Sequence, residues 1–200
     1  MVILGITGGI GSGKSYVSSL LREQLNVPVY DCDTEAKRLI CEDENIRHKL
    51  TELVGAQIFL NGKLQKHVLA DYLFASQQHA QKVNAIVHPV VKDDFCKWAK
   101  LQSAEVISME SAILYESGFD TAVNKVLYIN APTELRIQRT MKRDGCMRRQ
   151  VEARINLQQS EAQLKKADFV IDNGVEGKEF LLKELQKVLE KITANEAERL

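Results

Sequence analysis

The sequence predicts an α/β protein in which a five-stranded parallel sheet is flanked by helices. Three observations support this prediction: five short apolar runs rich in β-branched residues, helical periodicity between these runs, and a glycine-rich loop that links the first run to a helix. The five expected strands cover residues 2–7, 27–31, 105–109, 125–130 and 167–171. Right-handed crossovers would place their carboxyl ends at one edge of the sheet, where ligands bind in folds of this class.

The composition excludes several classes of protein. The 200 residues include 27 Lys and Arg and 27 Asp and Glu, so the formal net charge is zero, which argues against wholesale binding to nucleic acid or to an anionic membrane. No apolar run is long enough to span a bilayer and the chain starts with a strand, so we expect a cytoplasmic protein. The oligomeric state does not follow from these observations, and the expectation is a monomer or a weak homo-oligomer. The cysteines form no C-x-x-C pair, which predicts reduced thiols and no cysteine-based metal site.

Residues 8–15 match the phosphate-binding pattern G-x-x-x-x-G-K-[ST], with Gly8, Gly13, Lys14 and Ser15 at the fixed positions. A glycine-rich turn that matches by chance is the alternative, and the order of strand, loop and helix argues against it. Glycines let successive N–H groups point into one concavity at a helix N-terminus, which favours an anion. We therefore expect Lys14 to reach the β- and γ-phosphates of a nucleotide and the Ser15 hydroxyl to bind Mg²⁺.

Two carboxylates, Asp31 and Asp33, follow the second expected strand. In an extended segment alternate side chains share a face, so both would point the same way, with Cys32 opposite. At the carboxyl end of a parallel strand they would face the phosphate loop, as a general base or as a ligand of a Mg²⁺-bound water. The other interpretation is that Asp33 or Thr34 caps a helix that begins at Glu35. The sequence leaves both interpretations open.

About seventy residues separate the second and third strands, which is too many for an ordinary crossover. We predict a helical substrate-binding subdomain over residues 34–103, with a turn at Asn61-Gly62. The expected helices cover residues 35–40, 46–53, 64–74 and 77–101. His88-Pro89 interrupts the last of them, since proline breaks or kinks a helix, and the simplest interpretation of His88 is a residue at a kink.

Residues 134–166 predict a basic helical hairpin that serves as a lid. Arg136, Arg139 and Arg143 have the spacing i, i+3, i+7 and share one helical face, and Asp144-Gly145 marks the tip. Arginines neutralise the charge on a transferred phosphoryl group, and closure of a lid excludes water. A solvated basic face is the alternative, but the neutrality of the whole chain makes this local excess of positive charge favour a lid.

The remaining residues, 1–33, 104–133 and 167–200, form the expected nucleotide-binding core. Glu110 ends the third strand, where a carboxylate can hold a Mg²⁺-bound water, and Glu116 lies in the following loop. An ordinary helix or loop charge is the simpler interpretation of both glutamates.

Together these stretches resemble the dephospho-CoA kinase family. The resemblance covers nearly the whole chain and rests on residues 6–15, 31–33, 88–89, 114–118, 139–154 and 167–173. Many kinases share the phosphate loop, but the combination and order of these stretches are specific. The resemblance implies a P-loop kinase fold with strand order 2-3-1-4-5. It also implies ATP-dependent phosphorylation of the ribose 3′-hydroxyl of dephospho-CoA with Mg²⁺, the last step of CoA synthesis.

The same resemblance implies roles for individual residues. Asp33 would be the base or orienting group for the 3′-hydroxyl, with Lys14 and Arg139 as further catalytic residues. Dephospho-CoA would lie against Asp31, Asp33 and His88, and Asn173 would lie near the adenine of ATP. The ATP-binding set would be Gly8, Gly9, Gly11, Ser12, Gly13, Lys14, Ser15, Tyr16, Arg143 and Asn173.

Two positions depart from the family pattern. Tyr16 replaces a small hydroxyl residue that usually touches the α-phosphate, so we expect the backbone N–H to suffice there. Glu110 opens a segment, Glu-Ser-Ala-Ile-Leu, where the family often has Asp-Val-Pro-Leu-Leu, which leaves its role open.

Two alternative functions are weaker. A nucleoside-monophosphate kinase of the adenylate type usually carries a proline and Gly-Lys-Gly in its loop, and both are absent here. A GTP-binding switch needs an N-K-x-D motif, and the nearest match, residues 124–127, ends in Leu.

Overall fold

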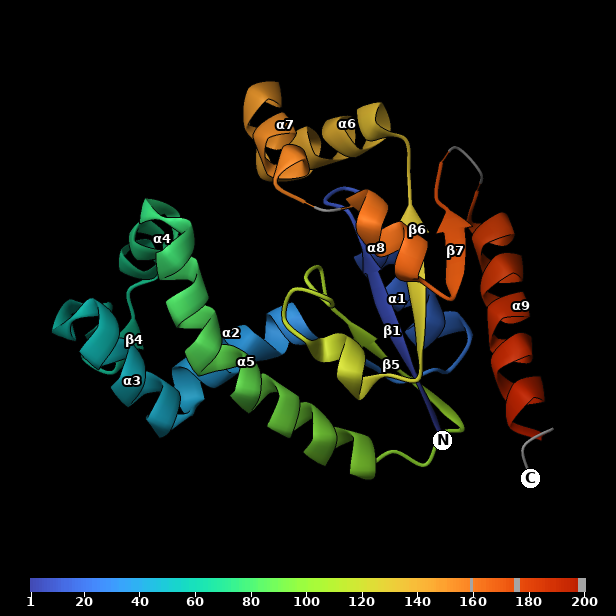
Figure 1. Ribbon diagram of the computed structural model, residues 1–200, viewed down its shortest axis with the longest axis horizontal. Helices are drawn as coiled ribbons and strands as arrows, with labels where there is room; N and C mark the ends of the chain where they lie inside the picture. Colours follow the sequence, from blue (N-terminus) through green and yellow to red (C-terminus); the bar gives the residue numbers. More distant parts are fainter. Residues whose placement is uncertain (159, 175–176, 198–200) are drawn as a thin grey trace. The chain divides into compact units, whose positions relative to one another are not determined.

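The computed structural model describes residues 1–158, 160–174 and 177–197. The chain divides into two compact units, one made of Met1–Tyr30 with Gln102–Leu200 and the other of Asp31–Leu101 (Figure 1).

The first unit contains the five predicted strands in one sheet. Their order is β2-β5-β1-β6-β7, which is 2-3-1-4-5 when these five are counted along the chain. The pairs of β1 with β5, β1 with β6, and β6 with β7 are parallel, so the predicted fold class is confirmed. The strand bounds are Val2–Gly8 for β1, Val29–Asp31 for β2, Val106–Glu110 for β5, Lys125–Asn130 for β6 and Phe169–Asp172 for β7.

The register of the sheet brings the end of each strand to one edge. Ile6 of β1 is paired with Glu110 of β5, Gly8 with Ile129 of β6, and β6 in turn pairs with β7. The residue after Gly8 starts the glycine-rich loop, so the loop emerges beside the carboxylate that ends β5. The pairing of parallel strands thus positions the site.

Apolar faces of two helices cover one side of this sheet. Helix α1 (Lys14–Gln24) contributes Val17, Leu20 and Leu21, and α9 (Lys178–Ala197) contributes a stripe that includes the fully buried Leu185. They pack with Leu4 of β1 and neighbouring strand residues into one core cluster. The other described helices of this unit are α6 (Thr133–Asp144), α7 (Arg148–Asn156), α8 (Ser160–Lys166) and the 3₁₀ turn Phe119–Ala122.

The second unit is mainly helical, as predicted for this stretch. Its elements are α2 (Cys32–Glu42), α3 (Glu44–Val54), the 3₁₀ turn Ala56–Ile58, β3 (Phe59–Leu60), β4 (Lys63–Leu64), α4 (Lys66–Ala75) and α5 (Gln77–Lys100). The predicted turn at Asn61-Gly62 is the tip of a β3–β4 hairpin, with φ of 49° and 75°. Positive φ at both central residues is typical of the tight turns that join two antiparallel strands. The helix expected over residues 64–74 therefore begins only at Lys66.

Helix α5 continues through Pro89, so the expected interruption there is wrong for the helix as a whole. Proline removes one hydrogen bond to the carbonyl four residues earlier. The helix persists because a buried stripe continues on both sides of the proline. That stripe consists of Val83, Val87, Val91, Phe95 and Ala99, one residue per turn.

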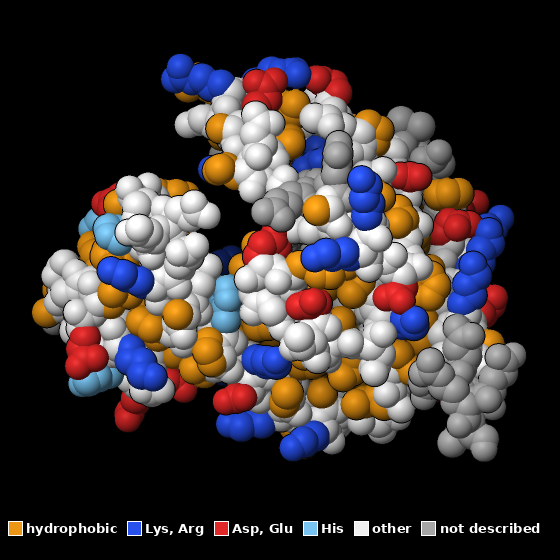
Figure 2. Space-filling model, viewed as in Figure 1, with side chains coloured by type: hydrophobic (Ala, Val, Ile, Leu, Met, Phe, Trp, Pro, Cys, Tyr) orange, Lys and Arg blue, Asp and Glu red, His pale blue; other side chains and the backbone are white. Residues whose placement is uncertain are grey.

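None of the helices within the described residues combines the length and the apolar character needed to cross a bilayer. Figure 2 shows basic and acidic side chains interspersed over the face it draws, in keeping with the equal numbers of the two in the chain.

Candidate active site

The glycine-rich loop turns sharply from β1 into α1. Gly11 and Gly13 have φ of 75° and 94°, a left-handed region that favours glycine. A Cβ at Gly13 would overlap the side-chain amide of Asn173, and one at Gly11 would overlap the Arg136 carbonyl and the Thr140 hydroxyl. These two glycines are therefore required both for the backbone conformation and for close packing against α6 and the end of β7.

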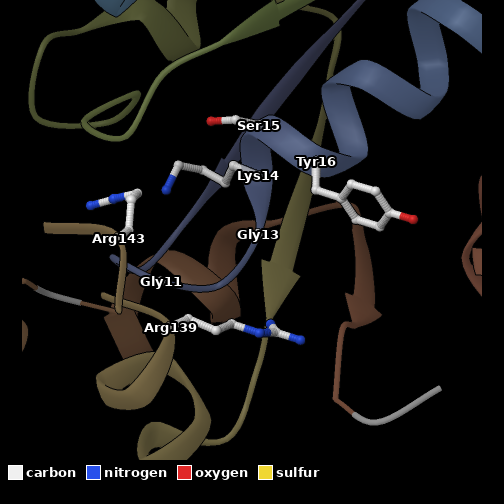
Figure 3. Close-up of a pocket in the computed structure, with 7 residues that line it drawn as sticks. All are labelled: Gly11, Gly13, Lys14, Ser15, Tyr16, Arg139 and Arg143. Atoms are coloured by element: carbon white, nitrogen blue, oxygen red, sulfur yellow. The ribbon is translucent and has the colours of Figure 1, made fainter. Parts of the chain in front are cut away.

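A cavity of about 230 Å³ opens beside the loop (Figure 3). Seven of the predicted site residues line it: Gly11, Gly13, Lys14, Ser15, Tyr16, Arg139 and Arg143. Lys14 Nζ donates to the carbonyl oxygens of Gly8 (2.8 Å) and Gly9 (3.3 Å), so the ammonium group lies along the loop. The Tyr16 side chain points away from Lys14 and is 47% exposed.

Ser15 and Glu110 form a second feature at this edge. Ser15 Oγ donates to Glu110 Oε1 at 2.9 Å, and Glu110 is only 6% exposed. Within the described residues, His, Cys, Asp and Glu gather nowhere in a group of three or more that could hold a metal ion. Mg²⁺ at phosphate-transfer sites needs only one or two protein oxygens, because phosphate oxygens and water supply the rest. The hydroxyl of Ser15 and the carboxylate of Glu110 fit that requirement.

Arg139 and Asn173 hold the loop from the side of β7. Arg139 donates from Nη1 to the Asn173 carbonyl (3.0 Å) and from Nη2 to the Gly174 carbonyl (3.1 Å). The Asn173 side chain donates to the Ser12 carbonyl at 2.8 Å and is 5% exposed. The predicted catalytic arginine and the predicted adenine-side asparagine are thus joined to each other and to the loop.

Arg143 lines the cavity while it forms a two-pronged ion pair with Asp144. The two distances are 2.7 Å for Nε to Oδ1 and 3.1 Å for Nη2 to Oδ2. This hydrogen bonding raises the pKa of Arg143 and lowers that of Asp144. Arg154 also reaches Asp144, at 3.2 Å, so one carboxylate joins α6 to α7 near the turn between them.

The predicted basic hairpin consists of α6 and α7, with α8 following, and Gly145 ends α6 with φ of 63°. Part of its positive charge is neutralised within the hairpin. Arg148 donates two hydrogen bonds to Glu134 and one to Glu152. Arg139 and Arg143 are the two basic residues of this stretch that line the cavity.

Gln158, just after α7, is a site residue that sequence reasoning missed. Its Oε1 accepts a hydrogen bond from the Ile10 N–H of the loop at 2.8 Å. The two residues are 148 positions apart, so no local pattern signals the contact.

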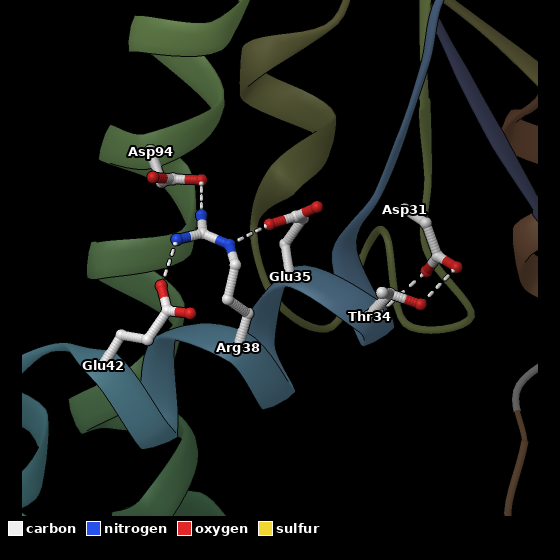
Figure 4. Close-up of polar contacts among 6 residues, drawn as sticks. All are labelled: Asp31, Thr34, Glu35, Arg38, Glu42 and Asp94. Atoms are coloured by element: carbon white, nitrogen blue, oxygen red, sulfur yellow. Dashed lines mark hydrogen bonds and ion pairs between the residues drawn. The ribbon is translucent and has the colours of Figure 1, made fainter.

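In the second unit, Asp31 is the N-cap of α2 (Figure 4). Its Oδ1 accepts from the N–H groups of Asp33 (3.0 Å) and Thr34 (3.1 Å), and its Oδ2 accepts from the Thr34 hydroxyl (2.7 Å). The expectation that Asp33 or Thr34 caps a helix starting at Glu35 is therefore wrong, because the helix begins earlier, at Cys32. For the same reason Asp31 and Asp33 do not alternate along one extended segment.

Asp33 lies exposed in the first turn of α2, and His88 lies on α5. Burial lowers the pKa of His88, and the negative charge of Asp33 opposes this shift. Two of the predicted substrate residues therefore interact through charge within the second unit. Arg38 ties the same two helices together through Glu35 and Glu42 of α2 and Asp94 of α5 (Figure 4).

The chain is similar in sequence and in fold to dephospho-CoA kinases. A family model described as dephospho-CoA kinase matches residues 2–179. A dephospho-CoA kinase from Bacteroides fragilis is 49% identical over 172 residues, which are 85% of this chain and 83% of that protein. The crystal structure of TT1252 from Thermus thermophilus is 32% identical, with a TM-score of 0.82 over 95% of this chain and 96% of that one.

A dephospho-CoA kinase from Campylobacter jejuni, 24% identical, has the same fold, with a TM-score of 0.70 over 97% of this chain and 98% of that one. The predicted P-loop kinase fold is therefore confirmed. With a family model that matches almost the whole length and a relative identical at half of the aligned positions, the chain belongs to the dephospho-CoA kinase family.

Proposed function

We propose that this protein transfers the γ-phosphoryl group of ATP to the ribose 3′-hydroxyl of dephospho-CoA, giving CoA and ADP, the last step of CoA synthesis. The observation that carries the proposal is the cavity at the glycine-rich loop, where Lys14, Ser15 and Arg143 converge in a chain of this family.

The triphosphate would bind in the concavity of the loop. Its N–H groups at the start of α1 and the Lys14 ammonium would offset the negative charge of the β- and γ-phosphates. Ser15 and Glu110 would hold Mg²⁺, which supplies further charge neutralisation at the same oxygens. Arg139 and Arg143 would stabilise the charge that spreads over the transferred group. Asn173 would sit on the adenine side of the loop, and the Tyr16 backbone would meet the α-phosphate.

The acceptor would bind to the helical unit, for which we propose the bounds 34–103, with 134–166 as the lid. Asp33 is exposed, and its carboxylate would accept the proton of the 3′-hydroxyl as the hydroxyl oxygen bonds to the γ-phosphorus and the bond to ADP breaks. His88 and Asp31 would lie on the substrate side. The charge of Asp33 acts on His88, and Asp31 caps the first turn of α2, which carries Asp33.

An assay that couples ADP release to a chromogenic reaction tests the proposal. Dephospho-CoA is expected to give a far higher kcat/KM than AMP, UMP, dTMP or shikimate. Phosphorus NMR of the product should show a new phosphomonoester on the ribose 3′ position. Equal rates with dephospho-CoA and AMP would contradict the proposal and favour a nucleoside-monophosphate kinase.

We also propose that the enzyme works in the cytoplasm as a monomer or weak homo-oligomer, without nucleic acid or membrane as a partner. None of the cysteines Cys32, Cys41, Cys96 and Cys146 is in a disulfide bond, in keeping with a reducing compartment. Sedimentation velocity at micromolar concentration, with and without ATP, tests the oligomeric state, and a stable tetramer would contradict it.

A further inference from the structure

The backbone of Ile10, at the tip of the glycine-rich loop, is held from two sides. Its N–H donates to Gln158 Oε1 at 2.8 Å, and its carbonyl accepts from Arg136 Nε at 2.9 Å. Arg136 Nη2 also donates to Gln158 Oε1, at 3.3 Å, so the two side chains support each other. Arg136 is 6% exposed, and burial lowers its pKa. Burying a charged group destabilises the fold unless hydrogen bonds satisfy it, so a guanidinium buried to this degree needs hydrogen-bond partners in fixed positions.

These two contacts fix the orientation of two peptide groups. The described chain contains no cis peptide bonds, and in a trans peptide the N–H and the C=O point in opposite directions. The Ile10 carbonyl shares its peptide with the Gly11 N–H, so the bond to Arg136 directs that N–H away from α6. Gly11 lines the phosphate cavity, where an outward N–H is a donor for an anion.

The other peptide group joins Gly9 to Ile10. The bond from the Ile10 N–H to Gln158 directs the Gly9 carbonyl the opposite way. That carbonyl accepts from Lys14 Nζ (3.3 Å) and from the Ser12 N–H (3.1 Å). Gln158 therefore helps to set the carbonyl against which Lys14 lies.

A loop with this composition needs such support. Gly9 and Gly11 flank Ile10, and glycine populates positive and negative φ almost equally, so the peptides on either side of Ile10 can rotate at little cost. We propose that Arg136 and Gln158 are positioning residues that hold these two peptides in the orientation that binds the phosphates of the nucleotide. This positioning role depends on one part of the proposed function, namely that the loop binds a nucleoside triphosphate.

Substitutions at Gln158 separate the acceptor oxygen from the bulk of the side chain. Gln158→Met removes the acceptor while keeping the length, and Gln158→Glu keeps an oxygen for both Ile10 and Arg136. We expect Gln158→Met to raise the Kd for a Mg²⁺-bound non-hydrolysable ATP analogue about 10-fold, because two donors lose their partner. Gln158→Glu is expected to stay within about twofold of the wild type for the same reason.

Calorimetric titration gives these Kd values without any acceptor, so failure of the proposed acceptor specificity would leave this test intact. Steady-state kinetics should show the same split, with KM for ATP raised and KM for dephospho-CoA unchanged. The amide resonance of Gly11 reports the geometry directly. In the wild type it is expected to move downfield when the analogue binds, and in Gln158→Met this shift should shrink.

Gln150→Met is the matched control, since Gln150 also accepts a backbone N–H within the hairpin, that of Met147 at 2.9 Å, and among the described residues it forms no hydrogen bond with the loop. Its analogue Kd should equal that of the wild type. Arg136→Lys should weaken analogue binding, because one ammonium cannot replace a fork that reaches Ile10 and Gln158 together. An unchanged Kd in Gln158→Met, or equal losses in Gln158→Met, Gln158→Glu and Gln150→Met, would overturn the proposal.

Discussion

Asp33 and His88 are the residues whose chemistry most needs testing, because the negative charge of Asp33 acts on the His88 ring within the helical unit. Asp33 sits in the first turn of α2, where its N–H is bonded to Asp31, so its own carboxylate is not used as the cap. An exposed carboxylate is a side chain that can accept a proton from a hydroxyl group.

Replacement of Asp33 by Asn removes the proton acceptor and preserves the shape of the side chain. We expect kcat with dephospho-CoA to fall roughly 100- to 10,000-fold, as is usual when a general base is lost. The Kd for an ATP analogue should stay within about twofold of the wild type, because the loop contacts are intact. Single-turnover kinetics measure the chemical step, and a normal rate there would remove Asp33 from the mechanism.

The ring of His88 should titrate below the usual value of 6.5, because burial disfavours its charged form. NMR titration of its ring protons measures this pKa. In Asp33→Asn the pKa should fall further, since the opposing negative charge is gone. As the unfolded chain binds the proton more readily than the folded one, the stability from neutral His88 is complete above pH 6.5 and declines as the pH falls toward the folded pKa. A His88 pKa above 6.5 would contradict this.

At the level of elements, the N-cap at Asp31 stabilises the first turn of α2, which contains Asp33. Asp31 accepts two backbone N–H groups there, so Asp31→Ala should cost about 1 kcal/mol of unfolding free energy. Asp31→Asn keeps an acceptor oxygen and should recover most of this loss. Denaturant unfolding monitored by circular dichroism measures the difference.

The two substitutions also separate capping from substrate binding at Asp31. If its role is capping, KM for dephospho-CoA should be near normal in Asp31→Asn. An Asn variant with full stability but a greatly raised KM would instead assign the carboxylate charge to the substrate.

Helix α9 contributes to stability rather than to chemistry. Leu185 is fully buried in the cluster that α1 and α9 form with the sheet. Leu185→Ala should destabilise the fold by about 2–5 kcal/mol, through lost burial and the cavity left behind. Thermal unfolding followed by calorimetry tests this, with the exposed Leu157→Ala as a control that should change little. Equal effects at the two positions would be inconsistent with the core described.

At the level of the whole molecule, the sequence predicted the features that depend on residues close together in the chain. The glycine-rich loop, five strands and the turn at Asn61-Gly62 follow from residue type and short-range pattern, and the strand order came from family resemblance. Contacts between distant segments had no such signal. Ser15 meets Glu110 across 95 positions, and Ser12 meets Asn173 across 161. The cap at Asp31 was local, yet it was missed because Asp33 and Thr34 are also preferred residue types at an N-cap.

Division of the chain into a loop-bearing unit and a helical unit leads to a prediction about ligand-induced stability. A ligand that binds only the folded state stabilises it by RT ln(1 + [L]/Kd), about 2.7 kcal/mol at a concentration of 100 Kd. For a chain of this size that corresponds to a rise in Tm of about 5–10 °C. In Lys14→Met the rise caused by the ATP analogue should disappear, whereas the rise caused by dephospho-CoA should remain.

Asp33→Asn is the complementary variant, because Asp33 lies in the helical unit. In this variant the ATP analogue should still cause the full rise in Tm. Scanning calorimetry at matched ligand concentrations compares the two variants with the wild type. If Lys14→Met lost both responses while remaining folded, the acceptor would depend on the loop for its binding. Assignment of dephospho-CoA to the helical unit would then be wrong.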